Sequence, residues 1–266
     1  MTITLVFQAD RYRAGTRHRP HQHDALHLSL VLSGRVAETV GSVTEFAGAL
    51  SVVAKDAGVV HADDFGIAGA RLARLTLPGG TIGGLVDEPT RSPGWRWTHD
   101  ARVARPFLRL VQRASAGVCA FAADDPDVLD LLAEFTARPA AVPRGRPPAW
   151  LEQTMRELRT SWHPRLSVAD VAARAGVHPV YLARSVRRWF STGVGEELRR
   201  LRLRSAAASI TESSGTVSTI AHEGGFADEP HLCREFRRAV GMTPGRYHAL
   251  VGDLGYTRRG DLPGAS

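Results

Sequence analysis

The sequence predicts an α+β chain of two domains. The first is a small N-terminal β-barrel or jelly roll followed by helices, and the second is a C-terminal all-α domain with two helix-turn-helix motifs. Three observations predict this fold class: short β-rich segments separated by glycines fill the first part of the chain, helical periodicity dominates the rest, and a Pro/Arg-rich segment divides the two. A length of 266 residues also fits two domains better than one.

The β-barrel is expected over residues 1–85. Apolar and β-branched residues gather there in short runs, and glycines such as Gly34, Gly48 and Gly58 lie between the runs. Short strands of regular spacing are typical of small antiparallel barrels and jelly rolls. The expected strands cover residues 4–7, 26–32, 35–40, 49–53 and 70–77.

Four histidines in this region have a spacing that suits a metal. His21, His23 and His27 share parity, so on a continuous strand their side chains fall on one face, and His61 would come from a partner strand. Imidazoles that converge from two strands can hold zinc, iron, nickel or copper. The same histidines could instead line a pocket for an organic effector. His18 is expected at the surface rather than as a further ligand.

The pattern around these histidines resembles the first cupin motif, with His27 where that family usually has Glu. A partial second motif follows in residues 48–61, without the usual proline. The resemblance implies a cupin-like barrel that binds an effector. The residues that carry the first motif are Gly15, His21, His23, His27 and Gly34.

Residues 86–137 are expected to be a helical segment. Apolar side chains recur on one side of residues 102–116. A second apolar stripe runs through residues 125–137, where Asp125 is the expected N-cap before Pro126. Each stripe is most simply explained by burial in the core of the chain itself.

Residues 138–148, with the sequence RPAAVPRGRPP, form the clearest boundary in the chain. Their proline content predicts a semi-rigid linker. The all-α domain is expected over residues 149–252, beginning with a helix over residues 150–161. Residues 253–266 are expected to be a flexible tail.

The sharper helix-turn-helix pattern lies between residues 220 and 247. Gly225 suits a turn that needs a positive φ, Asp228 is the expected N-cap, and Pro230 fits the first helical turn. The helix that follows, residues 229–240, places Leu232 and Phe236 four residues apart on its inner face. Its other face is therefore expected to meet solvent.

The first helix-turn-helix pattern begins at Ser167, which forms a capping box with Asp170. Gly176 makes the turn, and a second helix is expected over residues 179–190. Residues 196–210 then form a helix that is apolar over a wide arc. Such a helix needs partners on two sides, which two flanking helix-turn-helix units supply.

The order of residues from Ile220 to Tyr247 resembles the C-terminal signature of AraC/XylS-family transcription regulators, and the resemblance covers about a hundred residues. It implies sequence-specific DNA binding by helices 179–190 and 229–240 in adjacent major grooves. It also implies double-stranded DNA, RNA polymerase, a small-molecule or metal effector and a second copy of the chain as partners. The departures from the family pattern are His178, Val186, Ser191 and Glu197, where Ser, Phe, Gly and Tyr are usual.

The resemblance assigns roles to particular side chains. Arg184 and Arg234 lie opposite the buried stripes and are expected to contact guanine. Arg187, Arg237 and Arg238 are expected to hold phosphates. The residues expected to face base edges are Val180, Ala183, Arg184, Glu229, His231, Cys233 and Arg234.

Composition agrees with a nucleic-acid partner. The net charge is +7, and residues 149–250 hold 15 Arg and no Lys against 10 acidic residues. The chain has no run of 18 or more apolar residues, and its N-terminus lacks a basic region and a cleavage site, so neither a membrane span nor a signal peptide is expected. Cys119 and Cys233 match no zinc spacing. A reduced, cytoplasmic location is expected.

Two other functions compete with transcription regulation. A cupin metalloenzyme with an attached DNA-binding domain would use the metal histidines for catalysis. The barrel, however, offers only Asp24, Glu38, Glu45 and the pair Asp63-Asp64, without a recognisable catalytic spacing. A DNA-repair protein with a zinc-activated cysteine is disfavoured because Cys119 stands alone in its half of the chain. The chain is therefore expected not to be an enzyme.

Overall fold

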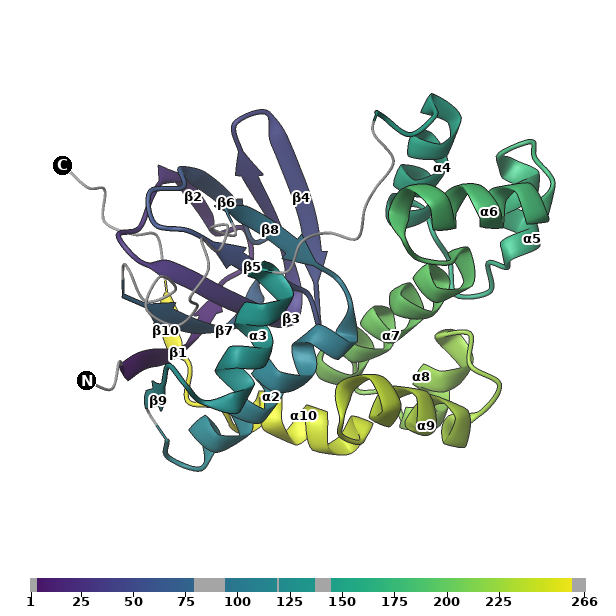
Figure 1. The fold of residues 1–266 in the computed structure, drawn as a ribbon. Helices are drawn as coiled ribbons and strands as arrows, with labels where there is room; N and C mark the ends of the chain where they lie inside the picture. Colours follow the sequence, from purple (N-terminus) through teal and green to yellow (C-terminus); the bar gives the residue numbers. More distant parts are fainter. Residues whose placement is uncertain (1–3, 79–93, 119, 137–144, 260–266) are drawn as a thin grey trace.

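The computed structural model describes residues 4–78, 94–118, 120–136 and 145–259. Strands gather in the N-terminal part and helices in the C-terminal part, which confirms the predicted α+β arrangement (Figure 1). The strands before the helical domain are β1 (Thr4–Tyr12), β2 (Arg17–His21), β3 (Leu26–Val40), β4 (Val43–Gly48), β5 (Val52–Lys55), β6 (His61–Asp64), β7 (Ala70–Leu77), β8 (Trp95–Thr98) and β9 (Ala120–Ala122).

Strand β3 organises the sheet because it is long enough to join two sets of strands. It has 15 residues, and its register against β7 shifts between Val31 and Ser33. Its first half pairs with β5 and β7, and its second half pairs with β4 and β6. Strand β1 extends the sheet beyond β7, β8 extends it beyond β5, and β2 adds to β6.

The closed barrel expected from the sequence is not observed, because the described strands form an open sheet. The order β10-β1-β7-β3-β5-β8 ends at β10 on one side and at β8 on the other, and these two strands do not pair. The irregularity in β3 diverts its second half to separate partners, so the strands do not follow one closed path.

Two helices pack against the sheet. They are α2 (Ala101–Ser115) and α3 (Pro126–Thr136), close to the expected bounds. The carboxylate of Asp100 caps α2 by accepting the backbone N–H of Arg102 at 3.0 Å. Phe107 and Leu131 are fully buried in the same core as Leu28 and Leu75 of the sheet. Both apolar stripes therefore serve the chain's own core, as predicted.

The C-terminal part contains both predicted helix-turn-helix units. The capping box between Ser167 and Asp170 is present. Gly225 has a φ of +75°, and a Cβ there would lie 2.3 Å from the carbonyl oxygen of Pro164, so the turn requires glycine. The helices are α4 (Ala149–Thr160), α5 (Val168–Arg174), α6 (Pro179–Phe190), α7 (Val194–Glu212), α8 (Val217–Glu223), α9 (Glu229–Val240) and α10 (Pro244–Asp253).

The two units lie on different cores. Helices α4, α5 and α6 pack with the first half of α7, through residues such as Leu182 and Leu198. The second half of α7 packs with α8, α9 and α10 in the core that also contains the sheet and α2. The second helix-turn-helix unit is thus continuous with the sheet, whereas the first stands apart (Figure 1).

The prediction of a flexible tail over residues 253–266 is wrong for its first part, up to residue 259. Residues Thr257–Arg259 form strand β10, which pairs in parallel with β1. The hydroxyl of Tyr256 donates to the carbonyl of Val251 at 2.8 Å, and the guanidinium of Arg71 lies 5.5 Å from the centre of its ring. These contacts direct the chain along the open edge of the sheet.

Some expectations fall on residues that the structure does not describe. They are the first part of the linker, residues 138–144, together with Cys119 and the last part of the tail, residues 260–266. Within the described ranges, no helix combines the length and the apolar character needed to cross a membrane.

Candidate functional site

The first recognition helix, α6, presents an exposed face opposite a buried stripe. Leu182 and Val186 are fully buried, whereas Val180 is 58% exposed. His178 caps the helix, because its Nδ1 accepts the backbone N–H of Val180 at 3.2 Å. The residues of this helix that were expected at the DNA and that are exposed are Val180, Ala183, Arg184 and Arg187.

The second recognition helix, α9, is built in the same way. A carboxylate oxygen of Asp228 accepts the backbone N–H of His231 at 2.6 Å, which confirms the predicted N-cap. Leu232 and Phe236 are fully buried and fix the rotation of the helix about its axis. The exposed members of the expected contact set on this helix are Glu229, Arg234, Arg237 and Arg238.

His231 and Cys233 are only partly exposed. The Nδ1 of His231 accepts the backbone N–H of Ala227 at 3.2 Å, and its ring meets Phe226 edge-on, with 5.6 Å between centroids. Burial raises the pKa of the Cys233 thiol, with a smaller contribution from Glu229, so the thiol stays protonated. These two side chains have less freedom to reach a base than the exposed arginines.

Most of the expected DNA-contacting arginines are unengaged. Among the described residues, the side chains of Arg184, Arg187, Arg234 and Arg237 make no hydrogen bond or ion pair. Arg238 differs, because a guanidinium nitrogen lies 3.4 Å from a carboxylate oxygen of Glu235. Free guanidinium groups on an exposed helix face suit contacts with phosphates and guanine edges.

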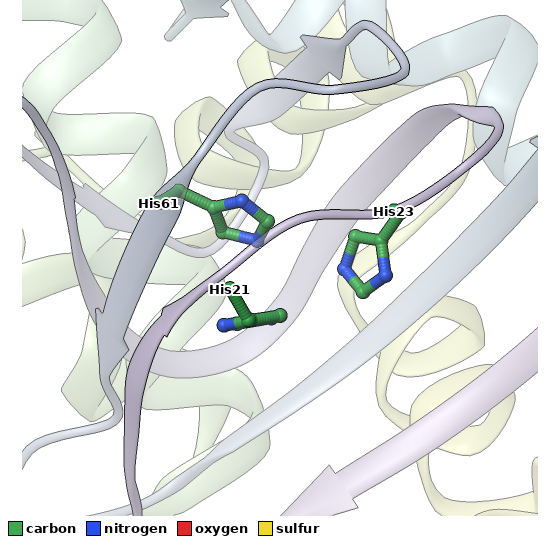
Figure 2. Close-up of side chains that lie close together, drawn as sticks. All are labelled: His21, His23 and His61. Atoms are coloured by element: carbon green, nitrogen blue, oxygen red, sulfur yellow. The ribbon is translucent and has the colours of Figure 1, made fainter. Parts of the chain in front are cut away.

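A second candidate site lies where histidines of β2 and β6 meet. His21, the last residue of β2, is paired in register with His61, the first residue of β6, and their ring centroids are 4.3 Å apart. Figure 2 shows these two rings together with that of His23, which follows β2. The ligand atoms of the three histidines all lie within 4.8 Å of one another.

Backbone contacts settle which nitrogen carries the proton in two of these rings. The Nδ1 of His21 lies 2.8 Å from the carbonyl oxygen of Arg19, and the Nδ1 of His61 lies 2.9 Å from that of Val59. A carbonyl oxygen only accepts hydrogen bonds, so each Nδ1 is the donor. In the neutral ring the Nε2 then keeps its lone pair.

The fourth predicted histidine stands slightly apart. His27 lies on β3, and its ring centroid is 4.4 Å from that of His23, but it belongs to none of the groups whose ligand atoms lie within 4.8 Å of one another. The expectation that residues 21, 23 and 27 share one continuous strand is wrong, because a turn separates β2 from β3. The assignment of His27 as a ligand stays a prediction.

Burial and nearby positive charges keep the rings of His23, His27 and His61 neutral. Burial, followed by the charge of Arg74, lowers the pKa of His23 and of His27 from 6.5 to about 3. Burial, followed by the charge of Lys55, lowers the pKa of His61 to about 4. Neutral imidazoles with available lone pairs are the form that binds metals.

His18 and Asp63 join the site, although the sequence did not predict them there. His18 was expected at the surface, but it is only 9% exposed, and its Nδ1 lies 3.4 Å from Oδ2 of Asp63. The alternation of β2 turns Arg17 outward and His18 inward, where the rings of Tyr12 and Phe65 flank it. The basic and polar neighbours of His18 in the sequence concealed this alternation.

Asp63 carries a negative charge in this site. Burial acts to raise the pKa of its carboxyl, but the hydrogen bond with His18 and the charge of Lys55 outweigh it and lower the pKa below its usual range. Close by, Glu38 is buried and forms an ion pair with Lys55. The indole N–H of Trp97 donates to Glu38 at 2.8 Å. The opposite charges of Lys55 and Glu38 thus compensate each other next to the histidines.

Comparisons with known proteins agree with the helical part of the structure. A family model described as a helix-turn-helix domain matches residues 171–249. A protein of Streptomyces lividans, named as an AraC-like transcription regulator, is 36% identical over 92 residues, which is 35% of this chain and 29% of that protein. The C-terminal part of the chain is thus similar to the helix-turn-helix domains of AraC-like regulators.

One further relative and one solved structure are also similar to this chain. The regulatory protein PocR of Salmonella typhimurium is 22% identical over 103 residues, or 39% of this chain and 34% of that protein. The chain thus spans about a third of the length of the curated relatives that it matches. Vibrio cholerae ToxT, solved with an unsaturated fatty acid bound, is similar at 11% identity with a TM-score of 0.37, over 96% of this chain and 98% of that one.

Proposed function

We propose that this protein is a sequence-specific DNA-binding transcription regulator controlled by a small ligand or a metal bound in its N-terminal part. The main observation in support is the pair of recognition helices in an AraC-type domain. Among the described residues, each helix has arginines without a hydrogen-bond or ion-pair partner on the face opposite its buried residues. Helix α7 separates the two helix-turn-helix units. With 19 residues it is about 28 Å long, close to the ~34 Å of one turn of B-DNA.

The arginines divide into two roles in this proposal. Arg184 and Arg234, near the middle of their helices, contact guanine edges and supply specificity. Arg187, Arg237 and Arg238, nearer the C-terminal ends, hold phosphates and set the register of the domain on the duplex. The net positive charge of residues 149–250 supports attraction to DNA at long range.

The shared core supports control by an effector. Because the second helix-turn-helix unit packs on the sheet, a ligand that shifts strands of the sheet can move α9 relative to α6. One candidate place for a ligand is the histidine site, with its cupin-like spacing. Another is a cavity of about 430 Å³ between the sheet and α7, bordered by Arg11, Arg71 and Glu212. A homodimer that also contacts RNA polymerase completes the proposal.

Selection of DNA by the full chain tests this function. The protein is incubated with a library of random duplexes, and bound duplexes are amplified and sequenced over several rounds. The proposal predicts enrichment of one motif with two elements about 10 base pairs apart, because two recognition helices read adjacent major grooves. Recovery of duplexes without a common motif would contradict sequence-specific binding.

A further inference from the structure

The geometry points to a binding site for a small polar carboxylate at Arg11 and Arg71, in the cavity between the sheet and the end of α7. None of the described histidines lines this cavity, so the site is separate from the one formed by β2 and β6. As the place of an effector it rests on the proposed function. As a binding site it rests only on the positions and charges of the side chains that border it.

The first support is the position of the two arginines on the sheet. Strands β1 and β7 are antiparallel neighbours, and Arg11 is the register partner of Arg71. The neighbouring pair on the same face, Ala9 and Ala73, is buried in the core that the sheet shares with the helices. The two arginines therefore lie at the rim of that core, directly opposite each other.

The second support is that no acid compensates their charge. Within the described structure, neither guanidinium forms a hydrogen bond or an ion pair, although that of Arg71 lies 5.5 Å from the ring centre of Tyr256. The adjacent Asp10 faces the other side of the sheet, where Arg74 lies 3.9 Å from it. Like charges directly opposite on adjacent strands are destabilising. A carboxylate between the arginines would remove this repulsion and accept charge-assisted hydrogen bonds.

The third support is the cavity that both arginines border. Its volume of about 430 Å³ is in the usual range for sites that bind small molecules. Among the described residues, no aliphatic side chain larger than alanine lines it, whereas Ser33 and Thr211 contribute hydroxyl groups. A ligand with hydroxyl groups of its own suits such walls better than a hydrocarbon does.

Glu212, the last residue of α7, indicates the charge of the ligand. Its Oε1 accepts the backbone N–H of Gly34 at 2.8 Å, and it forms no ion pair with a described arginine. The two guanidinium groups and this carboxylate leave one net positive charge among the described side chains of the cavity. A single ligand carboxylate neutralises that charge, whereas a phosphate dianion exceeds it. The bound ligand contacts β1, β7 and the end of α7 together, which connects the sheet to the helix between the two helix-turn-helix units.

Titration calorimetry of the full chain at constant ionic strength, without DNA, tests the site. The probes are gluconate, hexanoate and phosphate, because the first two share a six-carbon chain with one carboxylate and differ in their hydroxyl groups. The proposal predicts one gluconate per chain, bound more tightly than hexanoate or phosphate. Absence of gluconate binding, or tighter binding of either other probe, would overturn the proposal.

Variants of the arginines locate the bound carboxylate. Arg11→Gln and Arg71→Gln should each weaken gluconate binding by about tenfold or more, because each removes a charged hydrogen-bond donor. Arg19→Gln is the matched control, since Arg19 is an exposed arginine of β2 that does not line the cavity, and it should bind gluconate like the unchanged chain. Equal affinities for Arg11→Gln and Arg19→Gln would contradict the assignment.

Two further measurements separate a binding role from a structural one. Without a ligand, Arg11→Gln should unfold at the same temperature as the unchanged chain or a higher one, because it removes a like-charge contact. Glu212→Gln keeps an acceptor for the N–H of Gly34 but removes a negative charge, so gluconate affinity should rise by about threefold or more. A lower unfolding temperature for the first variant, or weaker binding by the second, would count against the site. Selection of duplexes tests DNA binding separately, so failure of this site is distinguishable from failure of the regulator function.

Discussion

Replacement of Tyr247 by Phe tests whether the second helix-turn-helix unit is joined to the sheet in solution. The hydroxyl of Tyr247 is buried and donates to the backbone carbonyl of Leu32 at 2.6 Å. Leu32 lies at the register shift of β3, between Val31 and Ser33, so it is skipped in the pairing with β7. Burial raises the pKa of Tyr247 well above its usual range, so the phenol remains a donor.

The magnitude follows from the loss of one partner in a buried pair. Tyr247→Phe keeps the ring and its edge-on contact with Phe236, where the centroids are 5.6 Å apart, but leaves the carbonyl of Leu32 unsatisfied. We expect the free energy of unfolding to fall by about 1–3 kcal/mol. Because sheet and helices share one core, the signals of both should shift together.

Urea unfolding of the full chain, followed by far-UV circular dichroism and tryptophan fluorescence, measures the change. Tyr181→Phe is the control, because that side chain is 54% exposed and its hydroxyl makes no hydrogen bond in the described structure. A Tyr247→Phe chain as stable as the control would refute the link between β3 and α10.

Three further predictions concern stability. Gly225→Ala should lower the free energy of unfolding by more than about 1 kcal/mol, because the new Cβ combines a positive φ with a clash against Pro164. Gly252→Ala in α10 is the control and should be neutral or stabilising, and urea unfolding compares the two variants. The free energy of unfolding should fall as pH drops from 6.5 toward 4, because histidines of the unfolded chain bind protons in this range whereas the buried histidines, with pKa values of about 3 or 4, stay neutral. Melts across that pH range should show a smaller dependence for His27→Gln, and an unchanged slope would contradict the prediction. The fragment 149–252 should unfold at lower urea than the full chain, because it exposes the face of α7, α9 and α10 that packs on the sheet; equal midpoints would contradict the shared core.

Local signals in the sequence predicted the helical domain well. The glycine turn at Gly225, the N-cap at Asp228 and the four-residue spacing of the buried residues along α9 all depend on residues close together in the sequence. Such short-range rules are visible without knowledge of the fold. The same holds for the spacing of His21 and His23.

Features that depend on distant pairing were not predictable in this way. The approach of His18 to Asp63 requires β2 and β6 to pair across 45 residues. Strand β10 exists because β1 leaves an open edge, which the composition of the C-terminal residues does not reveal. The core that the sheet shares with the second helix-turn-helix unit could not be predicted for a similar reason. The wide apolar arc of α7 shows that its second half is buried but does not indicate which element covers it.

Parallel measurements on Arg234→Ala and Arg237→Ala test the central claim most directly. Each variant and the unchanged chain are titrated with the selected duplex and with a random duplex at several salt concentrations. Regulation through sequence-specific recognition predicts that Arg234→Ala weakens binding to the selected duplex by about 1–3 kcal/mol with little change on random DNA. Arg237→Ala should weaken binding to both duplexes alike and reduce the salt dependence by about one phosphate contact. Equal losses on the two duplexes for Arg234→Ala would contradict the account.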